Sequence, residues 1–197
     1  MTLTTSPPQT ITAQDYLAQE VELETRNEYR NGEIIPMTGG TPDHNEINAN
    51  LIVLLKMALR KQPYSIFVTD QRLWIPERNI YTYPDTMVTP RPVELQSGRK
   101  DTVINPILIA EVLSKSTQQY DRTDKFEAYR TIASFQEYLL INQTRPHVEQ
   151  YVKQAANQWL FTELTGLEQI VTLRSLNNIE LALADLYEAI DFAMAGE

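Results

Sequence analysis

One acidic residue interrupts the most apolar run of this chain. The run ILIAEVLS at 107–114 holds Glu111 among isoleucine, leucine, valine and alanine. If the run is a strand, Ile107, Ile109, Glu111 and Leu113 share one face, and the apolar residues between them share the other. Two apolar faces are typical of a central strand that is covered on both sides. Because a buried carboxylate without a partner would become neutral, Glu111 needs a cation or a metal ion.

The segments before this strand contain recognisable start and turn signals. A helix is predicted after Thr12, which is a good N-cap residue. Two short extended runs around Asn31-Gly32 predict a tight hairpin, because both residues tolerate a positive φ. A longer helix is predicted from Thr41 and Pro42, with apolar residues at helical spacing along one face. The chain therefore begins with a helix, a hairpin and a long helix.

The rest of the chain alternates strands with little helix. Ser116 and Gln119 predict a capping box at the start of one polar helix at 118–132, and a short closing helix is predicted at 183–190. The predicted strands are 64–70, 72–76, 80–88, 106–114, 135–142, 147–153, 157–164 and 168–173. This order predicts an α/β fold with one mixed β-sheet flanked by helices, an N-terminal hairpin and extra C-terminal strands. We expect a flexible N-terminal lead at 1–11 and a single domain at 12–197.

Composition narrows the kinds of site that the chain can hold. It has no cysteine and two histidines, so a metal would be bound mainly by oxygen, as magnesium, manganese and calcium are. The net charge is −9, which is unfavourable for nucleic acid, but residues 85–130 have 7 basic and 7 acidic side chains. No membrane span or secretory signal is indicated, so we expect a cytoplasmic protein without a membrane partner.

A second carboxylate is predicted next to Glu111. The run IYTYPDTMV at 80–88 places Asp85 in a β-rich stretch, with Tyr81, Tyr83 and Met87 expected on its own face. The separation between Asp85 and Glu111 is long enough for the chain to turn and return as an adjacent strand. Two carboxylates from neighbouring strands form an oxygen site for a hard divalent cation.

Lys125 adds a cation to this pair of acids. Asp121, Lys125 and Tyr129 recur every four residues, so one helix face can point at the strand ends. A lysine beside metal-bound water can position the water or stabilise charge on a phosphate, which favours phosphodiester hydrolysis. Another interpretation stays open, in which Glu111 forms only a structural ion pair with Lys125 or Arg122.

These motifs together resemble a known family. The chain is similar to the PD-(D/E)XK nuclease superfamily and, more narrowly, to the bacterial family described as "putative restriction endonucleases", from about residue 28 to 151. The matching residues are Tyr83-Pro84-Asp85, Asn105-Pro106, Glu111-Val112-Leu113-Ser114, Asp121 to Lys125 and Tyr129-Arg130. The resemblance implies a restriction-endonuclease-like fold, cleavage of DNA, dependence on Mg²⁺ with Mn²⁺ as a substitute, and a homodimer. It implies metal ligands at Asp85, Glu111 and the backbone carbonyl of Val112.

The chain departs from the superfamily at one catalytic position. The lysine expected two residues after Glu111 is Leu113, and in the narrower family its role falls to the position of Lys125, with Lys115 as a weaker alternative. The resemblance also includes a histidine at His44, which could contact a water or phosphate near the acids. Glu33 could approach the metal too, although an exposed hairpin charge is the simpler interpretation.

Two functional hypotheses follow for the whole chain. The first is a metal-dependent endonuclease that hydrolyses phosphodiester bonds in DNA, with Asp85, Glu111, Lys125 and His44 at its site. The second is a catalytically silent, nuclease-derived binding or assembly module, which Leu113 and the acidic net charge favour. Metal-dependent cleavage of DNA distinguishes the two.

Overall fold

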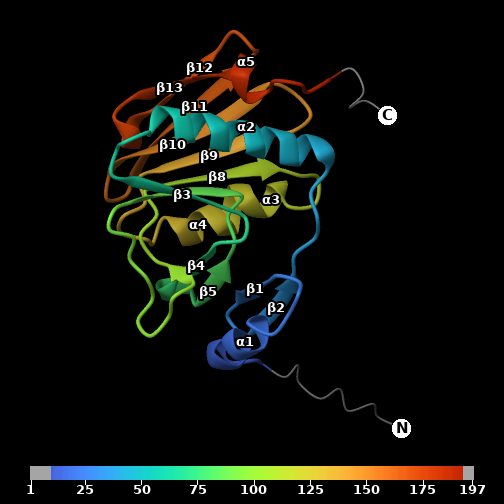
Figure 1. Ribbon diagram of the computed structural model, residues 1–197, viewed down its shortest axis with the longest axis vertical. Coiled ribbons are helices and arrows are strands. Elements are labelled where there is room, and N and C mark those ends of the chain that lie inside the picture. Colours follow the sequence, from blue (N-terminus) through green and yellow to red (C-terminus); the bar gives the residue numbers. More distant parts are fainter. Residues whose placement is uncertain (1–9, 193–197) are drawn as a thin grey trace.

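A six-stranded mixed sheet forms the centre of the protein, whose computed structural model describes residues 10–192 (Figure 1). The strands follow the order β11-β10-β9-β8-β6-β3, in which only β8 and β9 run parallel. Their bounds are β3 (Tyr64–Val68), β6 (Thr86–Pro90), β8 (Leu108–Leu113), β9 (Glu137–Asn142), β10 (His147–Ala155) and β11 (Gln158–Thr165). Every residue of β8 is buried, as predicted for a central strand.

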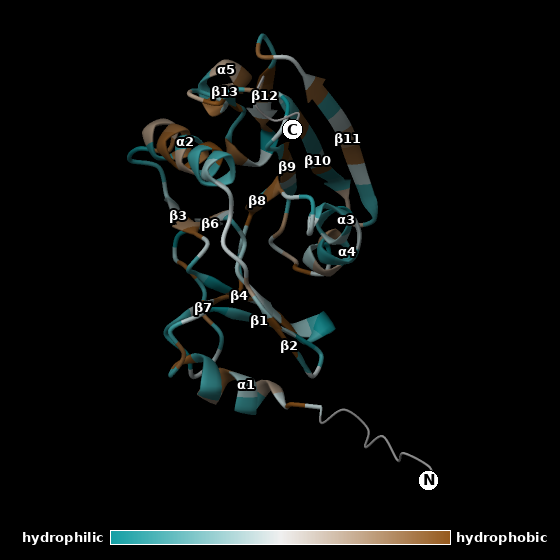
Figure 2. Cartoon of the chain, turned by 90° about the vertical axis from the view of Figure 1, so that its right-hand side faces the viewer, coloured by the Kyte–Doolittle hydropathy of each residue, from teal (hydrophilic) through white to brown (hydrophobic). Residues whose placement is uncertain are grey.

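Helices cover both faces of this sheet. Figure 2 shows α2 (Pro42–Ala58) on one side of β8, and α3 (Gln118–Tyr120) with α4 (Phe126–Tyr129) on the other. A π-helical turn, η2 (Asp121–Lys125), joins α3 to α4. On the α2 side, the core also includes side chains from the hairpin of β12 (Ile170–Leu173) and β13 (Ile179–Ala182) and from α5 (Leu183–Leu186).

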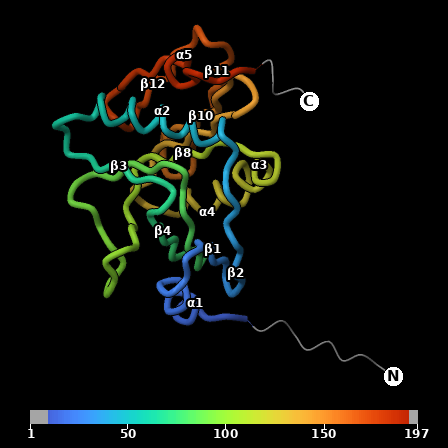
Figure 3. The backbone as a smooth tube through the Cα atoms, turned by 45° about the vertical axis from the view of Figure 1, so that its right-hand side comes forward, coloured from blue at the N-terminus to red at the C-terminus, as the bar shows by residue number. Residues whose placement is uncertain are grey.

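The strands of a second, five-stranded sheet alternate along the chain with the first strands of the large sheet. The order of this second sheet is β2-β1-β5-β4-β7, and its bounds are β1 (Asn27–Arg30), β2 (Glu33–Pro36), β4 (Arg72–Ile75), β5 (Ile80–Thr82) and β7 (Thr102–Val103). A short turn, η1 (Pro76–Arg78), separates β4 from β5. Tyr16 of α1 (Ala13–Glu20) stacks on Tyr29 of β1. Figure 3 shows α1, β1 and β2 at the opposite end of the molecule from α5 and β12.

The predicted local signals near the N-terminus are confirmed. Thr12 accepts a hydrogen bond from Asp15 N and begins α1, and Thr41 accepts one from His44 N and begins α2. Asn31 and Gly32 have φ values of 46° and 107° in the turn between β1 and β2. These caps and the hairpin form where local chemistry alone favours them.

Several predicted details are wrong. The single sheet is two sheets and a separate hairpin, and strands β7 and β13 were missed. The run 80–88 is not one strand: β5 belongs to the small sheet and β6 to the large one, with Pro84 and Asp85 at the crossing. Pro84 lacks an N–H for either ladder, which suits a crossing point. Ile107 packs with the α2 core, on the face opposite to Glu111, because β8 begins one residue later.

The polar helix also differs from its prediction. Its N-cap is Thr117 rather than Ser116, whose hydroxyl forms a hydrogen bond with the Ser114 hydroxyl at 3.0 Å instead of capping the helix. Its middle is the π-helical turn, and its last helical residue is Tyr129. Of the predicted N-terminal lead, residues 1–9 lie outside the described part, whereas Ile11 N donates to Gly32 O at 3.1 Å.

Candidate active site

Strand pairing brings the two predicted acids together. β6 and β8 are antiparallel with Thr86 opposite Ala110, so the residue before Thr86 lies beside Glu111. Asp85 N donates to Glu111 Oε2 at 3.3 Å, and Val112 N donates to Asp85 Oδ2 at 2.8 Å. Asp85 is therefore at the bend before β6, and Glu111 is inside β8. The backbone itself fixes the two carboxylates as neighbours.

His44 and Asn48, one turn apart on α2, hold the bend at Asp85. His44 Nε2 lies 3.1 Å from Asp85 Oδ2, and Asn48 Nδ2 donates to the Asp85 carbonyl at 3.1 Å. Burial lowers the pKa of His44, but the Asp85 carboxylate outweighs burial and raises it above its usual value. The opposite ring atom, His44 Nδ1, is buried without a hydrogen-bond partner among residues 10–192. A Cβ at Gly40 would lie 2.7 Å from that atom, so glycine leaves room for the ring.

Lys125 reaches Glu111 from the π-helical turn. Its Nζ lies 2.8 Å from Glu111 Oε1, 3.4 Å from Asp121 Oδ1 and 3.9 Å from Glu28 Oε1. Burial alone would lower the pKa of Lys125, but these carboxylates hold it well above the usual value. The side chain is thus a buried ammonium ion. π-Helical turns occur frequently at functional sites, and this one contributes both Asp121 and Lys125.

Glu111 is enclosed by these groups and by Tyr129. The Tyr129 hydroxyl donates to Glu111 Oε1 at 2.8 Å. Burial raises the pKa of Glu111 above its usual value, with Lys125 opposing the rise and Asp85 and Asp121 adding to it. The predicted stripe of Asp121, Lys125 and Tyr129 does face the strand, and all three side chains are buried. Arg122, the other predicted partner of Glu111, instead pairs with Glu149 at 2.7 Å.

Glu28 belongs to this cluster and was not predicted. It is 6% exposed, accepts a hydrogen bond from Thr82 Oγ1 and lies beside Lys125. Burial raises its pKa, but Lys125, Thr82 and Arg30 outweigh burial and lower it. Glu33, the acid considered from the same hairpin, is exposed and does not line the cavity described next. The spacing of Glu28 and Arg30 on one face of β1 was the available signal.

These side chains line a cavity of about 880 Å³. Its walls come from both sheets, the start of α2 and α3, and they include His44, Asp85, Glu111 and Lys125. Lys115 also lines it, as an exposed residue beyond β8 and with no ion pair among residues 10–192. The cavity gathers the predicted site residues Asp85, Glu111, Lys125 and His44, but not Glu33.

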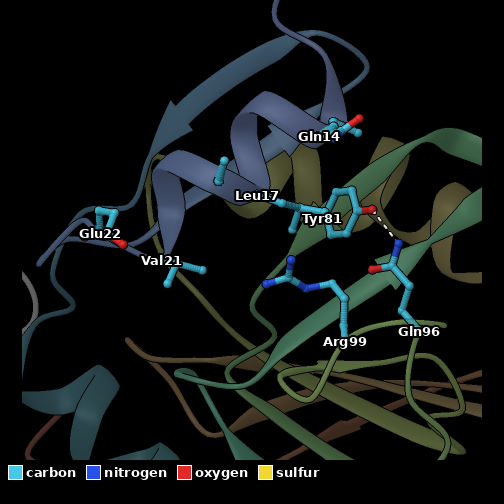
Figure 4. Close-up of a pocket in the computed structure, with 9 residues that line it drawn as sticks. Gln14, Leu17, Val21, Glu22, Tyr81, Gln96 and Arg99 are labelled. Carbon is cyan, nitrogen blue, oxygen red and sulfur yellow. Dashed lines mark hydrogen bonds between the residues drawn. The ribbon is translucent and has the colours of Figure 1, made fainter.

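A second cavity of about 550 Å³ lies beside α1 (Figure 4). Figure 4 shows Tyr81 and Gln96 there, with Gln96 Nε2 donating to the Tyr81 hydroxyl at 2.8 Å. Leu17 and Arg99 also line it, but none of the candidate acids does. This cavity is therefore separate from the candidate active site.

The donor set suits a hard divalent cation. Asp85 Oδ1 accepts no hydrogen bond within residues 10–192, and Glu111 Oε2 accepts only the long one from Asp85 N. That part of the chain contains no group of three histidine, cysteine or acidic side chains arranged for a metal. A cation would therefore have two carboxylates here, completed by backbone carbonyl and water, as magnesium sites often are. The predicted carbonyl ligand of Val112 stays a prediction.

No helix in the described part of the chain is long and apolar enough to cross a membrane.

Comparison with known proteins gives matches over most of the chain. The model of the Uma2 family, described as "Putative restriction endonuclease", matches residues 13–184. Uncharacterized protein sll1609 of Synechocystis sp. (strain ATCC 27184 / PCC 6803 / Kazusa) is 45% identical over 156 residues, covering 79% of this chain and 88% of that protein. Uncharacterized protein slr1290 of the same organism is 31% identical over 186 residues, covering 94% and 92%.

A solved structure shares the fold. The crystal structure of a "putative nuclease belonging to DUF820" from Anabaena variabilis superposes with a TM-score of 0.71 at 19% identity, covering 90% of this chain and 97% of that one. At this identity the likeness shows the fold alone, and it confirms the predicted nuclease-like architecture. The family model covers most of the chain, including every candidate site residue. The chain therefore belongs to the Uma2 family of putative restriction endonucleases, a family of nuclease type.

Proposed function

We propose that this protein is a metal-dependent endonuclease that hydrolyses phosphodiester bonds in DNA. The observation that supports the proposal is the meeting of Asp85, Glu111 and Lys125 in one cavity, from two paired strands and a helix. Membership of a nuclease-type family makes nucleic acid the substrate class. DNA as the particular nucleic acid, a homodimeric assembly and a cytoplasmic location are parts of the proposal.

Asp85 and Glu111 are the residues that would hold Mg²⁺, or Mn²⁺ in its place, together with the Val112 carbonyl. Such an ion lowers the pKa of bound water and stabilises negative charge on a phosphate. The protein fixes both carboxylates before any ion binds, because Val112 N holds Asp85 and Tyr129 holds Glu111. A site that is fixed in this way loses little conformational entropy on binding.

Lys125 acts in this proposal as a hydrogen-bond donor. Its raised pKa keeps it protonated at neutral pH, so it is not the base that removes a proton from water. An ammonium ion 2.8 Å from Glu111 is placed to orient a water beside that carboxylate or to stabilise charge on the phosphate. Lys115, exposed beyond β8, is the weaker alternative for the lysine role.

His44 has a supporting position in the proposed site. Its Nε2 lies 3.1 Å from Asp85 Oδ2, so a protonated Nε2 helps to fix the orientation of that ligand. Burial lowers the pKa of His44, but contact with the Asp85 carboxylate raises it above its usual value. We propose that the ring orients Asp85.

A silent module derived from a nuclease is the second candidate. Leu113 stands where the superfamily has its lysine, and Lys125 is enclosed by three carboxylates. If those ion pairs hold Lys125 away from substrate, the cluster stabilises the fold and the protein binds without cutting. This candidate predicts binding of nucleic acid that does not depend on Glu111.

Plasmid cleavage tests the proposal directly. Purified protein is incubated with supercoiled plasmid in Mg²⁺ or Mn²⁺, with EDTA as the metal-free control. The variants are Glu111→Ala in the cavity and Asp70→Ala, whose carboxylate pairs with Arg26 on the surface. Nicking that requires metal and Glu111 but not Asp70 supports the endonuclease. Folded wild-type protein that neither cuts nor binds metal in calorimetry would refute it.

A further inference from the structure

Arg30, the last residue of β1, presents a fixed guanidinium to the cavity of the candidate active site. Its Nε and Nη2 donate to Glu28 Oε2 at 3.2 and 2.5 Å. Its Cζ lies 3.6 Å from the ring centroid of Tyr120, so the guanidinium stacks on that ring. The side chain is 28% exposed. Arg30 is therefore held from two sides and still reaches solvent in the cavity.

This guanidinium has unused hydrogen-bond donors. Arginine has five N–H groups, and Arg30 uses Nε and Nη2 on Glu28, while Nη1 donates to no residue in the range 10–192. The other two cationic residues of the cavity, leaving His44 aside, differ from it. Lys125 has a side chain that is 9% exposed and is surrounded by carboxylates, and Lys115 is exposed without a fixing partner. Arg30 combines a fixed position with free donors.

The negative charge of the cavity suggests what those donors bind. Its lining includes four carboxylates, from Glu28, Asp85, Glu111 and Asp121. A nucleic-acid strand that enters this cavity brings further negative charge, which repels these acids unless cations meet the phosphates. The planar fork of arginine matches two oxygens of a phosphate, which a lysine ammonium does not.

We propose that Arg30 binds a backbone phosphate of the nucleic-acid strand next to the bond that is cut. Glu28 connects this contact with the reacting groups, because its carboxylate is hydrogen-bonded to Arg30 and lies 3.9 Å from Lys125 Nζ. In this arrangement the nucleic-acid strand passes between β1 of the small sheet and α3, the helix beside the large sheet. This assignment rests on the proposed nuclease function, and it makes Arg30 a substrate-binding residue rather than a catalytic one.

The test measures binding apart from cleavage. A short fluorescent DNA duplex and its single strand are titrated by anisotropy in Ca²⁺, over a series of salt concentrations. Arg30→Met is expected to weaken binding about tenfold, as loss of a hydrogen bond to a charged group does. The salt dependence of log Kd should fall by about one phosphate contact. Arg30→Lys should retain the salt dependence with an intermediate affinity, because the charge stays and the fork is lost.

Arg78→Met is the matched control. Arg78 forms an exposed ion pair with Glu127 and does not line the cavity, so its loss removes one positive charge elsewhere. Equal affinities and salt slopes for the Arg30→Met and Arg78→Met proteins would overturn the role of Arg30. If Arg30→Met does not fold, Arg30→Lys is the deciding variant. A lysine variant that binds DNA as tightly as wild type would refute a phosphate contact that needs the guanidinium group.

The same titration separates this proposal from the nuclease proposal. Suppose that wild-type protein binds the duplex in the titration, that Arg30→Met weakens this binding, and that wild-type protein cuts no plasmid in Mg²⁺ or Mn²⁺. This result would support the Arg30 contact and refute the endonuclease. Wild-type protein that binds neither probe would overturn both. When cleavage does occur, the change at Arg30 should raise KM more than it lowers kcat.

Discussion

Two buried glutamates on neighbouring strands show how similar positions produce different chemistry. Glu111 of β8 is 3% exposed, and Glu137 of β9 is 0% exposed. β8 and β9 are adjacent and parallel. Ile109 and Leu113, which share a face of β8 with Glu111, pack in the core with α4. Leu139 and Ile141, which share a face of β9 with Glu137, pack in the core with α2. The two carboxylates thus leave the same sheet in opposite directions.

Their partners differ in kind. Glu137 accepts hydrogen bonds from four neutral groups, Gln150 Nε2, Arg174 N, Ser175 N and Ser175 Oγ. The last three groups belong to the first two residues of the short turn η3 (Arg174–Leu176). Glu111 is instead beside three charged groups, Lys125, Asp85 and Asp121, and it lines a cavity. A carboxylate satisfied by neutral donors is a structural connector. One that shares a cavity with other charges is a candidate for chemistry.

The largest expected effect distinguishes these roles by activity. Glu111→Gln should lower the rate of plasmid cleavage by about 100-fold or more, as loss of one transition-state stabilising group does. The fold should survive, because Lys125 keeps Asp121 and Glu28 as partners. Cleavage rates under single-turnover conditions measure the effect. A folded Glu111→Gln protein that cuts as fast as wild type would reduce Glu111 to a structural ion pair.

The same substitution at the other glutamate, Glu137→Gln, should lower the free energy of unfolding. In Glu137→Gln, the amide NH₂ group must face one of the N–H groups that now donate to the carboxylate. Two opposed donors leave a buried group unsatisfied, at a cost of about 1 to 3 kcal/mol. Urea unfolding measures the loss, and cleavage per folded molecule should stay at the wild-type value. A Glu137→Gln protein that is stable but does not cut would contradict the division of roles.

Sequence alone identified the central strand and its acid for a simple reason. Glu111 is conspicuous because every neighbour of it in the strand is apolar. Glu137 lies in FQEYLLIN, next to a polar residue, and Glu28 lies in the polar run RNEYRNGE, so neither stood out. Both are buried because distant segments cover them, Thr82 and Lys125 in the case of Glu28. Contacts of that separation leave no local pattern.

Other features needed the whole fold for the same reason. Lys125 was predicted to face the strand ends, but the depth of its burial was not predictable, because Glu28 of β1 lies beside it and the lysine is 7% exposed. The π-helical turn depends on backbone hydrogen bonds that no side-chain pattern specifies. The split of 80–88 between two sheets follows from where β4 and β8 happen to lie. The caps at Thr12 and Thr41 and the turn at Asn31-Gly32 were predictable because the groups that form them are a few residues apart.

A pair of adjacent glycines tests the position of His44. Gly40→Ala would place a Cβ 2.7 Å from His44 Nδ1, whereas a Cβ at Gly39 meets nothing within 4 Å. The clash should displace the ring from Asp85 and lower cleavage by about tenfold, since outer-shell partners of metal ligands have effects of this order. Gly39→Ala is the matched control. Equal cleavage rates for the two variants would show that His44 does not orient Asp85.

The last comparison removes one hydroxyl group beside each glutamate. Tyr129→Phe removes the donor 2.8 Å from Glu111 Oε1, and Ser175→Ala removes the donor 2.7 Å from Glu137 Oε2. Each loss should cost about 1 to 3 kcal/mol of unfolding free energy, because each leaves a charged acceptor with one bond fewer. Only Tyr129→Phe should also slow cleavage, since only Glu111 needs a fixed orientation to hold a metal ion. If both variants lose stability and neither loses activity, the Tyr129 hydroxyl stabilises the fold alone, and the orientation of Glu111 is set by Lys125 and the Asp85 N–H.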